Sequence, residues 1–153
     1  MALKITNQEI KKILNRSSQL LGVEIKNEEI EEIAKRSRFT PRIANHLLKR
    51  VRDFAQVKKT NMDKGTIDDA MRLLGIDNRG LGKTEREFLK TLQNTFNGGP
   101  VGLKTLSASL QEEDETLEDV VEPYLMQIGF IERTPRGRTI TASGKKYLED
   151  EII

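Results

Sequence analysis

Residues 130–141 read FIERTPRGRTIT, and this stretch decides the fold of the second half of the chain. Two strand-like segments flank Thr134-Pro135-Arg136-Gly137, and a Pro-x-Gly turn between such segments predicts a β-hairpin. Because a tight hairpin has no interior, we expect Arg133, Arg136 and Arg138 to project into solvent. Guanidinium forks match phosphate oxygens, so the turn is a candidate for contacts with a DNA backbone. A solvated turn with arginines that serve solubility is the alternative.

The segments around this hairpin follow the order of a winged helix. The expected helices are residues 84–96, 103–110, 116–128 and 143–151, with a tight loop at 97–102 that can hold one strand residue and strands at 130–133 and 138–141. In the first of these helices we expect Phe88, Leu89, Leu92 and Phe96 to be buried. The order is the helix-turn-helix plan with a β-hairpin wing appended.

The helix at 116–128 begins in an acidic stretch that argues against base reading. Glu112, Glu113, Asp114 and Glu115 precede it, and Glu118 and Asp119 follow one turn later. When a helix-turn-helix protein binds DNA, the N-terminal residues of its recognition helix usually enter the major groove, where acidic side chains would repel the phosphates. We therefore expect this winged helix to contact DNA through its wing instead of through this helix. Capping and complementarity to the helix dipole account for the same acids equally well.

Four helices account for the first half of the chain and predict a small helical bundle. Their expected ranges are residues 7–21, 27–37, 40–57 and 66–74. Thr6 and Glu9 form a capping-box pattern ahead of the first helix, and Asn27 is expected to cap the second. Gly22 and Gly75 are natural helix ends.

Residues 76–83, IDNRGLGK, separate the two halves. Their two glycines, an asparagine and weak apolar periodicity predict a hinge. We therefore expect two domains, residues 1–78 and 79–153, in a mainly α protein. The first half holds 16 basic and 11 acidic residues and the second 10 and 13, which also favours two units with different surfaces.

Composition excludes several classes of function. Charged residues make up 33% of the chain and apolar residues 36%, with no apolar run long enough for a membrane span or a signal peptide, so we expect a cytoplasmic protein with no membrane partner. The chain has no cysteine and a single histidine, His46, so we expect no metal site. No GxxxxGK[ST] motif and no catalytic triad are present.

A second candidate for phosphate binding is Arg42, in the first turn of the third helix. A cation there opposes the helix dipole, and that cost is more readily tolerated where the arginine faces a phosphate. The free backbone N–H groups of the same turn also suit an anion. An exposed arginine that pairs with a neighbouring carboxylate is an equally good interpretation.

Taken in order, eight motifs resemble the C-terminal part of the RuvB family, the hexameric Holliday-junction branch-migration ATPases of bacteria. They are RSS at residues 16–18, TPRIAN at 40–45, RVRDFA at 50–55, GGPVGL at 98–103, TLEDV at 116–120, EPYL at 122–125, QIGF at 127–130 and RTPRGR at 133–138. The resemblance implies an AAA+ motor built from an ATPase domain, a helical lid and a winged helix, of which this chain matches the last two.

The resemblance gives a meaning to five positions, two of which depart from the family's usual residue. Arg42 corresponds to the sensor-2 arginine that contacts nucleotide phosphates, and Arg133 and Arg138 correspond to the outer arginines of the DNA-contacting wing. Ile5 stands where family members usually carry a tyrosine that packs on the nucleotide base. Phe39 stands where the family usually has glycine, and a bulky residue there restricts φ at the start of the helix.

The resemblance also implies ligands and partners. These are duplex or four-way junction DNA, a RuvA-type junction-binding protein, other copies in a homo-hexamer, and ATP with Mg²⁺ in the intact motor only. The chain alone is expected neither to bind this cofactor nor to hydrolyse ATP. A stand-alone winged-helix regulator of DNA and a protein-interaction module are the alternative functions.

Overall fold

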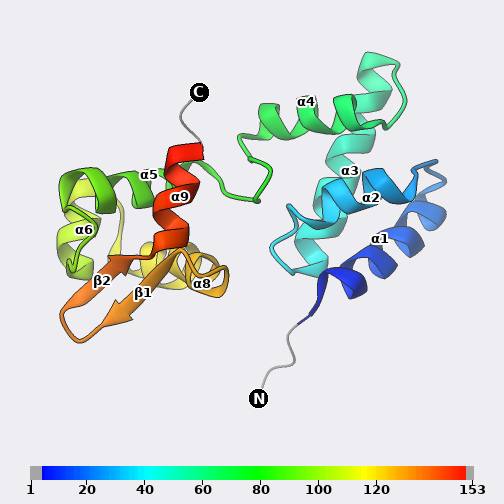
Figure 1. Cartoon of the computed structure of the whole chain (residues 1–153). Coiled ribbons are helices and arrows are strands. Elements are labelled where there is room, and N and C mark those ends of the chain that lie inside the picture. The colour runs from blue at the N-terminus through cyan, green and yellow to red at the C-terminus, as the bar shows by residue number, and fades with distance from the viewer. Residues whose placement is uncertain (1–4, 151–153) are drawn as a thin grey trace. The chain divides into compact units, whose positions relative to one another are not determined.

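The computed structural model describes residues 5–150, which form nine α-helices, two π-helical turns and one β-hairpin (Figure 1). Contacts divide the chain into two units, Met1–Gly82 and Lys83–Ile153, and the division falls within the segment where the sequence predicts a hinge. None of the helices within residues 5–150 has the length and apolar character needed to cross a membrane.

The first unit is a bundle of four helices. They are α1 (Asn7–Leu21), α2 (Asn27–Ala34), α3 (Pro41–Lys58) and α4 (Lys64–Leu74). In Figure 1, α1 lies against α2 and α3, and α4 packs against the other end of α3. Their apolar faces bury one core, to which α1 contributes Ile10 and Leu14, α2 contributes Ile30 and Ile33, α3 contributes Leu47, Leu48 and Val51, and α4 contributes Ile67 and Met71.

Caps explain where two of these helices, α1 and α4, begin and end. The expected capping box of α1 is confirmed: Glu9 donates its backbone N–H to the Thr6 hydroxyl at 3.2 Å, and the Glu9 side chain accepts from the Thr6 backbone. Gly22 and Gly75 end α1 and α4 in the left-handed conformation. The start of α4 lies earlier than expected, because the Asp63 carboxylate accepts the Thr66 N–H at 2.9 Å and so caps it.

Two expectations for α2 are wrong. Lys26 has the extended backbone of an N-cap while Asn27 is already helical, so Asn27 does not cap the helix. The helix also ends at Ala34 rather than residue 37. Side chains occupy its last carbonyls: Ser37 donates to the Ile33 oxygen at 2.6 Å, and Arg36 donates to the Glu32 oxygen at 2.8 Å.

Arg36 is the one strongly buried cation of the first unit's described residues, at 5% exposure. Its guanidinium donates to the Glu32 carboxylate at 2.9 Å and to Asp68 at 3.1 Å. Desolvation raises the pKa of Glu32, but hydrogen bonds and charges from Lys35 and Arg36 outweigh it and hold that pKa below its usual range. The cluster ties α2 to α4.

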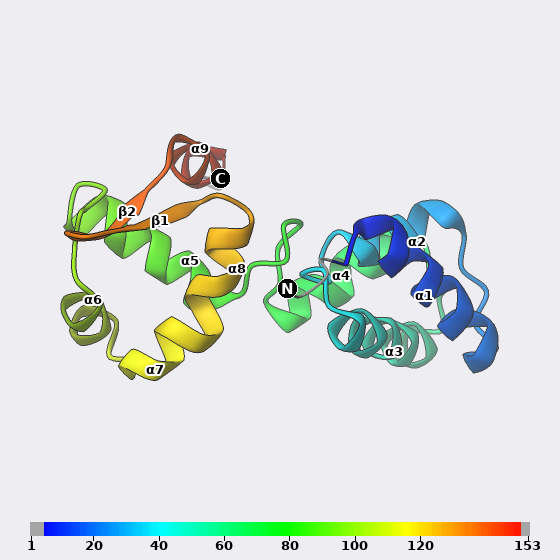
Figure 2. The same ribbon diagram turned by 90° about the horizontal axis from the view of Figure 1, so that it is seen from below.

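The second unit has the winged-helix order expected from the sequence. Its elements are α5 (Lys83–Lys90), η1 (Thr91–Thr95), α6 (Leu103–Leu110), α7 (Asp114–Thr116), η2 (Leu117–Val121), α8 (Glu122–Gln127), β1 (Ile131–Thr134), β2 (Gly137–Ile140) and α9 (Ala142–Asp150). Figure 2 shows α7 and α8 as parts of one helical rod, with η2 between them, and α8 packs against β1.

The hairpin pairs β1 with β2 in an antiparallel register that sets Ile131 opposite Ile140 and Arg133 opposite Arg138. Val101 forms the single strand residue expected in the preceding loop and bridges to Arg138. The core beneath includes Phe88, Leu89 and Leu92 as expected. Phe96, which was expected to be buried, is only half-buried; it is the C-cap residue of η1 and has a non-helical backbone, so it lies past the end of the helix.

Candidate nucleic-acid interface

The tip of the wing carries Arg136. Arg136 and Pro135 are exposed, and Arg136 anchors the turn through its backbone N–H, which donates to the Thr134 hydroxyl at 3.2 Å. That hydroxyl in turn donates to the Gly137 carbonyl at 2.8 Å. The Thr134 hydroxyl therefore stabilises the turn through two hydrogen bonds, while the Arg136 side chain is exposed to solvent, as expected from the sequence.

Gly137 is required at the next position of the turn. Its φ is +130°, and a Cβ there would lie 2.5 Å from the backbone carbonyl of Val101. Any other residue would force the Val101 strand away from β2. That strand is held by two backbone bonds, from Val101 N–H to the Arg138 carbonyl at 3.0 Å and from Arg138 N–H to the Val101 carbonyl at 2.7 Å.

The outer arginines of the wing do not both project freely into solvent, and that expectation is wrong for Arg138. Its Nε donates to Oε2 of Glu122 at 2.6 Å and its Nη2 donates to Oε1 at 3.2 Å, which leaves its side chain 16% exposed. Arg133 donates from Nη2 to Oε1 of the same carboxylate at 2.8 Å and is 41% exposed. The hairpin taken alone offers these arginines no partner; α8, which packs against β1, supplies one in Glu122.

Glu122 is the residue that sequence reasoning missed at this site. Its side chain has no exposed surface, and the two arginines occupy both of its oxygens. The hydrogen bond to Glu122 is the main cause that raises the pKa of the Arg138 guanidinium above its usual range. The helical spacing of the sequence could have indicated that Glu122 is buried, because it lies three residues before Leu125 and so falls on the apolar face of its helix.

The acidic stretch before and within η2 lies mostly at the surface. Glu113, Glu115, Glu118 and Asp119 are exposed, while Asp114 accepts a short hydrogen bond from the Ser107 hydroxyl. Exposed acids at these positions repel phosphates from this helix, although Glu118 also attracts the Arg138 guanidinium. The distribution of charge in the second unit is therefore uneven, with exposed acids at α7–η2 and arginines on the hairpin.

In the first unit, Arg42 is exposed in the first turn of α3. Thr40 is the N-cap residue, but it makes no side-chain cap, and its hydroxyl instead donates to the Arg38 carbonyl at 2.9 Å. Phe39 adopts φ +52°, the left-handed conformation that glycine takes most readily. The chain thus keeps a glycine-like turn into α3 despite the phenylalanine.

Ile5 is half-buried and packs against the core of the first unit. The position expected to contact a nucleotide base is therefore at least partly engaged in packing within the bundle. Both Ile5 and Arg42 belong to the first unit, whereas all three wing arginines belong to the second. Within the second unit, Glu122 brings Arg133 and Arg138 together, and Arg136 stands apart at the turn.

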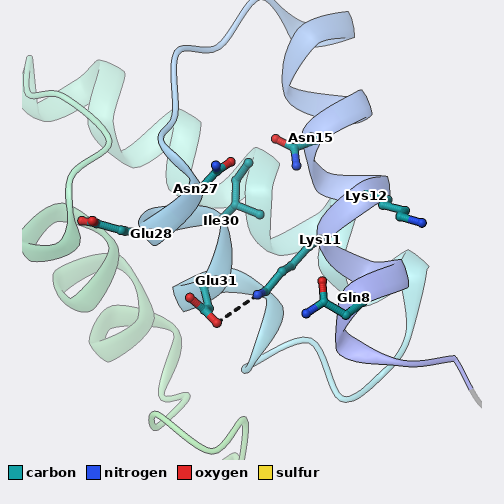
Figure 3. Close-up of a pocket in the computed structure, with 8 residues that line it drawn as sticks. All are labelled: Gln8, Lys11, Lys12, Asn15, Asn27, Glu28, Ile30 and Glu31. Atoms are coloured by element: carbon teal, nitrogen blue, oxygen red, sulfur yellow. Dashed lines mark hydrogen bonds and ion pairs between the residues drawn. The ribbon is translucent and has the colours of Figure 1, made fainter.

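A groove of about 330 Å³ between α1 and α2 is open and polar (Figure 3). Figure 3 shows Lys11 reaching across it to Glu31, and the two side chains form an ion pair of 2.9 Å. Because Lys12 and Glu28 also line it with opposite charges, the groove concentrates neither sign, and we assign it no ligand. Among residues 5–150, no three histidine, aspartate or glutamate side chains gather as metal ligands would.

Comparison with known proteins places both units. Residues 5–77 match the family model of the RuvB AAA lid domain, and residues 78–149 match that of the RuvB C-terminal winged helix domain. The fold is thus a helical lid of the AAA type followed by a winged helix with a basic wing. The chain belongs to the RuvB family and carries the lid and winged-helix domains of that family.

Relatives and solved structures agree with this assignment. The chain is 50% identical over 141 residues to the Holliday junction branch migration complex subunit RuvB of Ligilactobacillus salivarius. The aligned region covers 92% of this chain and 42% of that protein. The subunit of the same name from Leuconostoc mesenteroides is 51% identical over 144 residues, covering 94% and 41%. The Thermotoga maritima RuvB Holliday junction branch migration motor matches with a TM-score of 0.90 at 46% identity, over 99% of this chain and 51% of that one. The chain therefore spans about half the length, or less, of the proteins it matches.

Proposed function

We propose that this chain is the lid and DNA-binding part of an ATP-driven branch-migration motor that acts in recombination and DNA repair. Its wing grips duplex or four-way junction DNA, and its lid senses nucleotide held by the ATPase domain of the intact motor. The observation that carries the proposal is the exposed Arg136 at the tip of the hairpin that also holds the Arg133–Arg138 pair, in a chain of the RuvB family.

The wing binds the phosphate backbone, because guanidinium groups pair with phosphate oxygens and the exposed acids of α7 and η2 disfavour entry of that helix into a groove. Binding of this kind is nearly independent of sequence and strongly dependent on salt. Each phosphate neutralised adds about 0.9 to the magnitude of the slope of log affinity against log salt concentration.

A salt titration with fluorescent duplexes of unrelated sequence tests the wing. We expect similar affinities for all duplexes, a steep salt slope, and weaker binding by Arg136→Ala. Arg72→Ala is the matched control, because Arg72 is an exposed arginine of the lid, and it should bind as the wild type does. Unchanged affinity both in Arg136→Ala and in a folded double variant Arg133→Ala with Arg138→Ala would rule out the wing as the DNA contact.

The lid contributes Arg42 to a nucleotide phosphate when an ATPase domain supplies the nucleotide. The chemistry fits, since Arg42 is exposed in a helical first turn that no side chain caps, where backbone N–H groups favour anions. ATP with Mg²⁺ supplies the phosphate anhydride that the intact motor hydrolyses. Addition of this chain to an isolated RuvB ATPase domain should raise its ATPase rate, and Arg42→Ala should remove the gain. A gain that survives Arg42→Ala would refute the sensing role.

The partners proposed for the intact protein are a RuvA-type junction-binding protein and other copies in a homo-hexamer. Sedimentation of the intact protein with ATP, with and without junction DNA, measures the assembly.

Two alternative functions predict different results. A stand-alone regulator of DNA would require strong preference for one DNA sequence, and an interaction module would bind protein partners without binding DNA. The same duplex titration separates these alternatives.

A further inference from the structure

A fully buried carboxylate lies beneath the wing. Glu122 has 0% exposure, and three N–H groups point to its two oxygens: Nη2 of Arg133 at 2.8 Å, Nε of Arg138 at 2.6 Å and Nη2 of Arg138 at 3.2 Å. An ionised carboxylate so far from water persists only where charged donors compensate it. Glu122, Arg133 and Arg138 therefore form a buried ion-pair cluster and not an incidental surface salt bridge.

The hairpin register makes this cluster necessary. Arg133 and Arg138 are directly opposite each other on β1 and β2, and like charges in that position repel. One carboxylate between two guanidiniums offsets the repulsion but cancels only half of their positive charge. The exposed Glu118 also attracts the Arg138 guanidinium, whereas Arg133 has Glu122 alone as its ion-pair partner among the described residues.

The two arginines are held to different degrees. Arg138 is fixed twice, through its guanidinium by Glu122 and through its backbone by the two bonds to Val101. Arg133 gives a single N–H to Glu122 and remains 41% exposed. A guanidinium has five N–H donors, so both arginines keep donors beyond those that Glu122 uses.

We propose that Glu122 is a positioning residue for DNA binding: it holds Arg133 and Arg138 as a fixed pair that receives one backbone phosphate, and it does not touch DNA itself. The inference rests on the proposed function of the wing. A fixed pair loses less side-chain freedom on binding than two separate arginines do. The competing role is that of a mask, in which Glu122 competes with phosphate and must release the arginines before DNA binds.

Nuclear magnetic resonance of the wild-type chain separates positioning from masking. The Arg138 Nε–H, bonded to Glu122, should give a shifted resonance that exchanges slowly with water. On addition of a DNA duplex, positioning requires that this resonance keep its protection while the signals of Arg133 move. Loss of the protection on DNA binding would show that Glu122 releases Arg138, and would overturn the proposal.

Affinity of the Glu122→Gln variant is the second test. Gln keeps the size of the side chain but cannot compensate two guanidiniums, so duplex binding should weaken about tenfold, the loss of about one charge-assisted hydrogen bond. Glu115→Gln is the matched control: it removes the same charge from an exposed position of α7, so it should bind at least as tightly as the wild type.

The outcomes are distinct. Binding by Glu122→Gln that equals or exceeds that of wild type, in a variant that circular dichroism shows to be folded, contradicts positioning and leaves the wing assignment intact. If the variant does not fold, the measurement on the wild-type chain decides the question alone. Absence of duplex binding by the wild type itself would overturn both the proposed function and this inference.

Discussion

Ser17 donates its hydroxyl to the side-chain oxygen of Asn45 across 2.6 Å, and this bond joins α1 to α3. Asn45 lies three residues after Arg42 and therefore on the neighbouring turn of the same helix. Two of the motifs that carry the family resemblance, RSS and TPRIAN, thus meet in one hydrogen bond. The bond holds the first turns of α3, which carry Arg42, against α1.

We expect Ser17→Ala to lower the free energy of unfolding of the first unit by about 1 kcal/mol, because the partly buried Asn45 oxygen loses its donor. Amide hydrogen exchange of α3 measures the change. In the double variant with Asn45→Ala, the two losses should be less than additive, since both remove the same bond. Fully additive losses would mean that the bond contributes nothing.

Phe39 has φ +52°, a conformation that costs a non-glycine residue roughly 1–2 kcal/mol. Phe39→Gly relieves the strain but also removes the ring, so Phe39→Ala is the reference. We expect the glycine variant to be more stable than the alanine variant by about 1 kcal/mol, the reverse of their order inside a helix. Thermal unfolding followed by circular dichroism compares them, and an alanine variant of equal or greater stability would contradict the strained backbone.

Loss of Arg138 should lower the stability of the second unit much more than loss of Arg136, although both variants remove one positive charge from the hairpin. Arg138→Ala leaves the buried Glu122 with one partner, and we expect a loss of about 3 kcal/mol of stability. Arg136→Ala changes an exposed side chain, so its effect should stay within about 0.5 kcal/mol. Urea unfolding followed by tyrosine fluorescence is selective here, because both tyrosines, Tyr124 and Tyr147, lie in the second unit. Equal losses in the two variants would contradict the buried cluster.

Asp63 should make the first unit sensitive to acid. The Thr66 backbone N–H that donates to the Asp63 carboxylate holds its pKa below the usual range in the folded state. Its stabilising contribution is therefore fully present above the unfolded pKa of about 3.9 and is lost as the pH falls through the lower folded value. Asp63→Asn keeps a capping oxygen that does not titrate.

Thermal unfolding of α4 should therefore respond less to acid in Asp63→Asn than in the wild type between about pH 6 and about pH 2. The measurement is the loss of the helical signals of the α4 amides, followed by nuclear magnetic resonance as the temperature is raised at each pH. The same acid sensitivity in both proteins would assign the effect to other carboxylates.

Local sequence determined most of the fold. The Thr6–Glu9 capping box, the ends at Gly22 and Gly75, and the Pro-Arg-Gly turn of the wing depend on residues within four positions of each other, so their patterns were sufficient. Asn27 failed as a cap because its neighbour Lys26 has the extended backbone instead. Helix ends shifted where side chains competed for carbonyls, as Ser37 and Arg36 do at the end of α2.

The sequence by itself also pointed to Arg42 and the three wing arginines as candidate site residues, though not to Glu122, because arginines in a tight turn and at a helix start are unusual placements. Only the tertiary structure decided how they are held. Glu122 reaches Arg133 across 11 positions and Arg138 across 16, and burial of that carboxylate depends on the packing of α8 beneath the hairpin. Burial and charge pairing depend on which segments pack together in space, and no pattern within one segment states that.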